Sequence, residues 1–426
     1  MSLIKLKINI VDLIFFGIVY SFVLYAFEAP IRFYTDKMGL GVFIYTKDLA
    51  LLTVALLLIF RQNKIVVVYK IMILFFVFLA FYGAIALLNG VVMRQVLFAY
   101  KIYISLFIGI QSYRFLPQLS SRLIKAVNWL AFFSFLGLLV NVFYSFPWER
   151  AGMDIGGVTV DLSRSTVAAG GFKRIAGFGR NWSNPAYFAL IATVLNYSFL
   201  EKWKIRHILM TILFFIGMLI STNKGAIGAF LLITMFVLIK IRMPNVILKL
   251  GILALLLLVV ILPILSWSNL LIIDNNMPIV YRILFSSFKV RVEEVWPQAL
   301  DLIMNHGDLL FGRGIGGIGA SQIIFEPLLY HPGDNLFIYL YGLVGVFSFV
   351  ILAYFGVKII ALSIKESREG TFTALLAICF LGIGIIGTPL ENGVLNFFFG
   401  LMLASLYHQK IRVQRTFLYD HSNKII

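Results

Sequence analysis

Cationic side chains gather among glycines in two stretches that are too polar to cross a bilayer. In the first stretch, residues 147–183, Lys173, Arg174 and Arg180 stand just before the apolar run that begins at Asn184. Guanidinium groups, ammonium groups and the backbone N–H groups of a helix N-terminus all favour an anion, and phosphate is the natural ligand. The alternative is that these cations pair with lipid headgroups or with nearby carboxylates.

The second stretch, residues 267–334, carries Arg291 and also Arg313, which lies in the glycine run FGRGIGGIG. Glycines let backbone N–H groups approach an anion closely, although this run lacks the order of a nucleotide-binding loop. We therefore expect both arginines to bind a phosphate group. The alternative is a solvated helix face on which Arg291 pairs with Glu293 or Glu294.

His331 and Asp334 lie in the sequence HPGDN, directly before another apolar run. A histidine or a carboxylate beside several arginines is suited to take a proton from a hydroxyl group. The alternative is an ordinary turn at Pro332 and Gly333, with Asp334 capping a helix that begins at Asn335. Both interpretations hold together if Asp334 caps the helix while His331 accepts the proton.

Charged residues also interrupt the apolar runs, where an ionised group is costly unless it is partnered or faces a wet cavity. Lys224 and Glu391 fall at the outer ends of two runs, so we expect them to flank one cavity, with Lys224 adding to the anion site. Snorkelling of long side chains to the interface is the competing explanation. The charged residues concerned are Lys47, Asp48, Arg94, Lys101, Lys224 and Glu391.

Long apolar helices are the elements that must position these residues. Of the 426 residues 61% are hydrophobic and 13% charged, outside the range of soluble domains. A span needs about 20 apolar residues, and the runs do not alternate as barrel strands would. We predict an all-α polytopic integral membrane protein in which residues 1–426 form one transmembrane domain of about twelve spans. They are expected near 8–27, 40–60, 66–88, 94–112, 123–146, 184–200, 207–221, 224–240, 248–266, 335–357, 372–388 and 391–408.

The distribution of lysine and arginine predicts the orientation of the chain. With the N-terminus in the cytosol, the inner connections contain the whole net charge of +17. Both termini are then cytoplasmic, the two long loops lie outside, and the basic pI gives no reason to expect nucleic acid as a partner. In the second loop an apolar stripe predicts a helix lying along the membrane surface with its apolar side down, formed by Val290, Val295, Ala299, Leu300 and Ile303.

Five motifs occur in a recognisable order. They are R-x-x-G-x-x-x-N-x-x-x-P-A-Y-F-A from Arg174, S-T-N-K-G-A from Ser221, R-x-x-x-x-W-x-x-A-L-x-L-I from Arg291, F-G-R-G-I-G-G from Phe311, and H-x-x-D-N-L-F-I-Y-L from His331. In this order and topology the chain resembles the O-antigen ligase/polymerase superfamily over about residues 170 to 350.

The resemblance implies a GT-C-like, metal-independent glycosyltransferase of the bacterial inner membrane that needs no cofactor and acts through two periplasmic loops. By the same resemblance, Arg174 is the arginine of the first loop, Arg291 that of the surface helix, and His331 the histidine before the late span. Family members often have His-Asn where this chain has Asp334-Asn335, so either His331 or Asp334 is the base. The implied partners are undecaprenyl-diphosphate-linked glycans as donor and acceptor, membrane lipids, and a membrane protein that regulates chain length.

We expect an O-antigen polymerase, in which a hydroxyl of one lipid-linked repeat unit attacks the anomeric carbon of a growing chain and displaces undecaprenyl diphosphate. The outer loops contain no D-x-D or E-x-D pair to hold a metal, so cations of the chain must neutralise the leaving group. The alternatives are a ligase that transfers the glycan to lipid A core and a non-enzymatic lipid-linked oligosaccharide flippase. The expected diphosphate-binding residues are Lys173, Arg174, Arg180, Arg291, Arg313 and Lys224.

Overall fold

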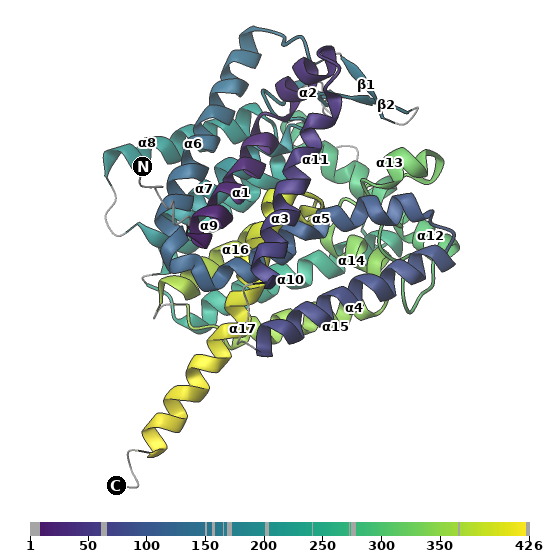
Figure 1. The fold of residues 1–426 in the computed structure, drawn as a ribbon. Helices are drawn as coiled ribbons and strands as arrows, with labels where there is room; N and C mark the ends of the chain where they lie inside the picture. Colours follow the sequence, from purple (N-terminus) through teal and green to yellow (C-terminus); the bar gives the residue numbers. More distant parts are fainter. Residues whose placement is uncertain are drawn as a thin grey trace, which may run out of the picture.

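The described residues include four short strands and are otherwise mostly helical. Figure 1 shows the helices as the bulk of the fold. The computed structural model describes residues 9–60, 66–149, 151–155, 158–164, 166–167, 173–200, 204–240, 242–271, 273, 278–364 and 367–422. The predicted all-α class is therefore confirmed in its main feature. Parts of both long loops, and the N-terminal residues 1–8, lie outside the described ranges.

Seventeen α-helices occur in the described residues, and they occupy each of the ranges that the sequence predicts as spans. They are α1 (Ile10–Ala26), α2 (Glu28–Lys37), α3 (Thr46–Phe60), α4 (Val66–Leu88), α5 (Met93–Ser112), α6 (Leu116–Phe143), α7 (Ser183–Phe199), α8 (Ile205–Ile220), α9 (Lys224–Lys240), α10 (Asn245–Trp267), α11 (Ile279–Val290), α12 (Trp296–His306), α13 (Gln322–Phe325), α14 (Leu336–Val344), α15 (Phe347–Ile360), α16 (Arg368–Gly384) and α17 (Gly393–Ser422).

Length and composition allow fewer spans than the sequence analysis predicts. Three described segments, Gly41–Ile59, Met93–Phe143 and Asn245–Trp267, are long and apolar enough to cross a membrane. The pair α1 and α2, bent by 81°, makes a fourth if it is one broken span, and several further apolar helices are shorter. Large apolar side chains lie exposed on many of these helices, which is expected where lipid covers the surface, as for Phe16, Leu74, Leu238, Leu257 and Val350.

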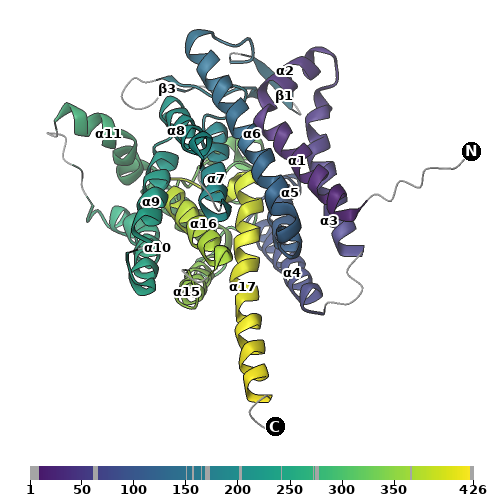
Figure 2. The same cartoon turned by 90° about the vertical axis from the view of Figure 1, so that its left-hand side faces the viewer.

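Helix α16 is the centre of the bundle (Figure 2). Every residue from Gly370 to Gly384 is buried, and the helix packs against α7, α9, α10 and α17. A helix that is apolar on all sides is stable only when neighbours surround it. Helices α5 and α17 approach closely where Gly109 faces Gly400, since a Cβ atom on Gly400 would lie 2.2 Å from the carbonyl oxygen of Leu106.

The first long loop folds back onto the bundle through two small β-hairpins and an aromatic cluster. Strands β1 (Gly152–Ile155) and β2 (Val158–Asp161) pair antiparallel, as do β3 (Thr166–Val167) and β4 (Lys173–Arg174). The indole N–H of Trp148 donates to the carbonyl oxygen of Gly177 at 3.1 Å, and the ring packs against Phe146. These contacts fix the end of the loop, which carries Arg174.

The second long loop contains α11, a π-helical turn at Arg291–Val295, and α12. Of the predicted apolar stripe, Ala299, Leu300 and Ile303 are buried where α12 packs against α10 and α14, whereas Val290 is 39% exposed. Protein therefore covers the part of the stripe that lies on α12, and the position of this segment along the membrane surface stays a prediction. The helical pattern itself was predicted correctly, because amphipathic periodicity does not specify what covers the apolar face.

The predicted span near 335–357 is two helices, α14 and α15, interrupted at Gly345. Gly345 has a φ of 58°, and a Cβ atom there would lie 2.4 Å from the backbone of Leu310. The break therefore gives the end of the second long loop a place to pack between the two helices. Hydrophobicity continues through the break, which explains why the sequence predicted one helix.

Candidate active site

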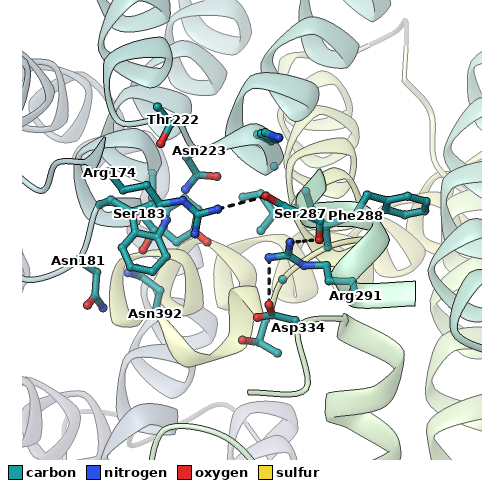
Figure 3. A pocket seen from close by; sticks show the side chains of 18 of the residues that line it. Arg174, Asn181, Ser183, Thr222, Asn223, Ser287, Phe288, Arg291, Asp334 and Asn392 are labelled. Carbon is teal, nitrogen blue, oxygen red and sulfur yellow. Dashed lines mark hydrogen bonds and ion pairs between the residues drawn. The ribbon is translucent and has the colours of Figure 1, made fainter. Parts of the chain in front are cut away.

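A cavity of about 430 Å³ opens where the two long loops meet the bundle (Figure 3). Its walls come from the end of the first loop, the start of α7, the turn between α8 and α9, helix α11, the HPGDN turn and the connection between α16 and α17. Segments that are more than 100 residues apart in the sequence thus share one polar space. Arg174, Arg291, Lys224, Asp334 and Glu391 all line it, so Lys224 and Glu391 share one cavity as expected.

Arg174 ends strand β4 and reaches across the cavity from the first loop. Its guanidinium lies over the Trp182 ring, 4.9 Å from the ring centroid, and donates to the hydroxyl of Ser287 at 3.4 Å. Its Nε atom is buried and makes no hydrogen bond within the described residues. Burial lowers the pKa of Arg174, and the positive charge of Arg291 acts in the same direction.

Arg291 begins the π-helical turn and approaches from the opposite side. Its guanidinium donates to the carbonyl oxygen of Ser287 at 2.9 Å and pairs with the carboxylate of Asp334 at 3.0 Å. As in Arg174, its Nε atom is buried without a hydrogen-bond partner in the part of the chain described. A π turn inserts an extra residue into a helix and is frequent at functional sites. In this chain the π turn begins at Arg291, whose side chain points into the cavity (Figure 3).

The HPGDN turn holds Asp334 in the cavity and Asn335 in the core. The side chain of Asn335 accepts from the N–H groups of Phe337 and Ile338, so Asn335 is the cap of α14. The interpretation of Asp334 as the cap is therefore wrong. Asp334 instead adopts a φ of 40° and directs its carboxylate to Arg291. This ion pair joins two distant parts of the second long loop, which local sequence does not show.

His331 is not among the residues that line the cavity. Its Nδ1 atom accepts from the N–H of Gly333 at 3.2 Å, an arrangement in which the neutral ring carries its proton on Nε2. Burial lowers the pKa of His331, while the charge of Asp334 opposes this shift. The ring is thus neutral near pH 7. Its unprotonated nitrogen, Nδ1, already accepts the hydrogen bond from Gly333. The predicted role of His331 as base is not tested by this geometry.

Glu391 ends the turn Pro389–Glu391 between α16 and α17, outside both helices. Its carboxylate accepts from the N–H of Ala320 at 2.6 Å and lies 3.4 Å from the hydroxyl of Thr388. Burial raises the pKa of Glu391 to about 7, which is the range in which a carboxylate can take up a proton at neutral pH. The sequence analysis identified Glu391 as a cavity residue but gave it no chemical role.

Three of the predicted diphosphate ligands lie elsewhere. Lys173 is half exposed and pairs with Glu149 at 2.9 Å, and Arg180 lies 3.8 Å from Glu28 in a different cavity. Arg313 is 1% exposed and its guanidinium is fully used by the carbonyl oxygens of His306 and Gly317 and by the carboxylate of Glu326. Arg313 therefore anchors the glycine run, and none of these three side chains lines the cavity that Arg174 and Arg291 share. Their charges alone could not distinguish a ligand contact from an internal ion pair.

The cavity is suited to an anion with more than one oxygen atom. Three cations from three segments face it, and their guanidinium and ammonium groups match the oxygen atoms of an anion such as a phosphate. Trp182 and Ser287 position these arginines and were missed by the sequence analysis, although both stand within quoted motifs or next to them. No group of three or more His, Cys, Asp or Glu side chains in the described residues could hold a metal ion.

Comparisons with known proteins add no relative. No protein-family model, curated protein or solved structure matches this chain. The chemistry of the site is therefore argued from its own residues.

Proposed function

We propose that this chain is a metal-independent glycosyltransferase of the bacterial inner membrane that polymerises glycans carried on undecaprenyl diphosphate. In this proposal the chain crosses the membrane about twelve times, with both termini in the cytoplasm and the cavity open to the periplasm. The observation that carries the proposal is the meeting of Arg174 and Arg291, from two different loops, at one cavity that Lys224 also lines.

The proposed reaction follows from the residues around this cavity. The hydroxyl oxygen of the acceptor attacks the anomeric carbon of the donor, a C–O bond forms, and the bond from the anomeric carbon to the diphosphate oxygen breaks. Undecaprenyl diphosphate leaves with the electron pair. Arg174, Arg291 and Lys224 stabilise the charge that develops on it, because guanidinium groups match the geometry of phosphate oxygens.

We assign the proton of the acceptor hydroxyl to Glu391. Among the carboxylates in the cavity, Asp334 is committed to its ion pair with Arg291, whereas Glu391 is held by the N–H of Ala320 and the hydroxyl of Thr388 and has a pKa close to neutrality. A group of that pKa is ionised often enough to accept a proton and basic enough to hold it. Asp334 and the Ser287 backbone then serve to orient Arg291 toward the diphosphate.

Reconstitution tests the proposal. The purified chain in nanodiscs, supplied with lipid-linked repeat units, is expected to form a ladder of longer glycans without any other enzyme. A strain without the gene is expected to keep one repeat unit on lipid A while losing long chains. Complete loss of attached units would instead identify a ligase, and movement of the lipid across liposomes without any new glycosidic bond would identify a flippase and refute the enzymatic proposal.

A further inference from the structure

A second, smaller polar cavity lies on the other side of Glu391. It measures about 170 Å³ and is formed by α1, α2, α3, α5, the end of the first loop and the start of α17. Asn181, Glu391 and Asn392 line both cavities, so the two spaces share a wall. The reaction described above uses only one face of this wall.

Buried ion pairs form one part of the second cavity. The carboxylate of Glu28 contacts Arg32 at 2.8 Å, Lys47 at 3.3 Å and Arg180 at 3.8 Å. Glu28, Arg32 and Lys47 are each exposed by 6% or less. One carboxylate thus serves three cations, and removing any member of the group would leave a buried charge without its partner.

Two further cations in this cavity lack a carboxylate of their own. Lys101 and Arg164 make no ion pair within the described residues. The ammonium of Lys101 lies 3.8 Å from the centroid of the Phe98 ring. The negative charge of Asp48 attracts it, although the two groups form no ion pair among the described residues. Arg164 is held by its backbone, whose N–H donates to the carbonyl oxygen of Arg180 at 2.7 Å.

The charge balance of this cavity calls for an anion. Five cationic side chains, from Arg32, Lys47, Lys101, Arg164 and Arg180, face three carboxyl groups, and one of the three is the shared Glu391. Positive charge concentrated in a poorly solvated space is destabilising unless a counter-charge is present. A space of this size admits a compact anion such as a phosphate or diphosphate group and excludes a folded chain segment.

We propose that this second cavity is a separate phosphate-binding site for the acceptor substrate, with Lys101 and Arg164 as its ligands. The inference rests on the proposed function, because a transfer between two lipid-linked glycans needs two anionic head groups bound at once. Glu391, on the wall between the two sites, then lies between the donor and the acceptor whose hydroxyl proton it takes. Arg32, Lys47 and Arg180 are held by Glu28 and act as positioning residues.

Binding of inorganic pyrophosphate to the full chain in phosphatidylcholine nanodiscs tests the site. The unaltered protein is expected to bind two equivalents. The double variant Lys101→Gln/Arg164→Gln should bind one, and Arg174→Gln should also bind one, because each removes a different site. Neither Lys101 nor Arg164 makes an ion pair among the described residues, so the double variant breaks no salt bridge there. The matched control is Lys37→Gln, an exposed lysine of α2 whose ammonium lies over Phe33, which should bind two.

Turnover connects the second site to the acceptor. With a long-chain donor and a labelled single repeat unit as acceptor, the double variant should raise the KM for the acceptor about tenfold or more, since charge-assisted hydrogen bonds of this kind are lost. The KM for the donor should stay unchanged. Retention of two equivalents by the double variant, or an unchanged acceptor KM, overturns the inference while leaving the glycosyltransferase proposal intact.

Two further outcomes separate the sources of the phosphate. Displacement of the second pyrophosphate when phosphatidylglycerol replaces phosphatidylcholine would identify a lipid headgroup site and overturn the assignment to an acceptor. If the protein binds two equivalents of pyrophosphate but transfers no glycan from any lipid-linked substrate, the proposed function is refuted. The assignment of the second cavity to an acceptor then fails as well, although both cavities still bind anions. Two equivalents, insensitivity to phosphatidylglycerol and a raised acceptor KM together support the inference.

Discussion

Ser287 couples the two arginines on which the proposed reaction depends. Its hydroxyl accepts from Arg174 of the first loop, and its carbonyl oxygen accepts from Arg291 of the second. Two guanidinium groups held this close repel each other, and the lowered pKa of Arg174, caused first by burial and then by Arg291, reflects that repulsion. An anion bound between them relieves it, so the residues that hold the arginines together also prepare the site for a diphosphate.

Replacing Arg174 by lysine tests whether its planar fork matters. Lysine keeps the charge but loses two-point binding to phosphate oxygens and the stacking on Trp182. We expect Arg174→Lys to lower kcat/KM at least about tenfold, nearly as much as Arg174→Ala. Initial rates of polymer formation measure the effect. The control is Lys173→Gln, the neighbouring cation on the protein surface, and equal rates for Arg174→Lys and the unaltered chain would contradict the assignment.

The pKa of Glu391 predicts a pH dependence. Only the ionised carboxylate accepts a proton, and its pKa is raised to about 7, so kcat should rise with pH through about 7 and level off above it. Glu391→Gln should lower kcat by about 10²–10⁴-fold and abolish this profile.

Because a raised carboxyl pKa makes ionisation of Glu391 destabilising, the stability of the folded chain is lost as pH rises through 7. The glutamine variant should therefore melt no lower than the unaltered chain at pH 8.

A surface carboxylate supplies the comparison for that experiment. Glu293, which pairs with Lys289 at 3.5 Å, lies outside both cavities, so Glu293→Gln should leave the pH profile in place. The same rate measurement applied to His331→Ala discriminates between the two candidate bases. A loss confined to His331→Ala, with Glu391→Gln fully active, would transfer the role of base to His331.

Charge neutralisation by arginine and lysine predicts that turnover does not need a divalent metal. Activity on purified lipid-linked repeat units should therefore be unchanged in EDTA. The measurement is the initial rate before and after chelation, followed by addition of magnesium or manganese. A rate that falls in EDTA and returns with either metal would show that a cation other than Arg174, Arg291 and Lys224 serves the diphosphate.

At the scale of elements, the second long loop is held by its fit into the break between α14 and α15. Glycines make this fit possible: a Cβ atom on Gly312 would lie 2.7 Å from the carbonyl oxygens of Tyr341 and Gly342, and the N–H of Arg313 donates to the latter at 2.7 Å. The buried guanidinium of Arg313 then ties the loop to the end of α12. Since α12 continues from the π turn, this anchor also sets the position of Arg291.

Gly345→Ala tests the anchor. A methyl group at a φ of 58° and 2.4 Å from the Leu310 backbone forces the loop away, and we expect a loss of at least about 2 kcal/mol in stability. Thermal unfolding in detergent and limited proteolysis of the second loop report the change. Gly251→Ala in α10, where a Cβ atom meets nothing within 4 Å, is the matched control and should melt at or above the temperature of the unaltered chain.

At the scale of the whole molecule, the described parts of both long loops meet the helix bundle at the two cavities. Both cavities form where these loops cover the ends of α1, α3, α5, α7, α9 and α17. The proposed orientation places both cavities on the periplasmic side. It also places the basic connection before α8 in the cytoplasm, where the distribution of lysine and arginine predicts it to be.

Site-directed labelling tests this orientation. The only cysteine of the chain, Cys379, is buried in α16, so a new cysteine is the only exposed thiol in a variant. Lys173→Cys should react with a membrane-impermeant maleimide in spheroplasts. Lys204→Cys, exposed just before α8, should react only after the membrane is permeabilised. The reverse pattern would invert the topology and place both cavities in the cytoplasm.

The sequence by itself determined the local features. Helices lie in all twelve predicted ranges because hydrophobicity and its periodicity are properties of contiguous residues. Charged residues in apolar runs also had to be partnered or face a cavity, and five of the six that the sequence identified line one of the two polar spaces. These are Lys47, Asp48, Lys101, Lys224 and Glu391.

Only the tertiary structure decided which charges share a cavity. Arg174 meets Arg291, while its neighbour Arg180 turns to Glu28, which the sequence analysis had not singled out. The same holds for Asp334, whose conformation is set by Arg291 and not by the helix that follows it. Such pairings join residues far apart along the chain, and they depend on how loops close over the bundle, which no local pattern of residues records.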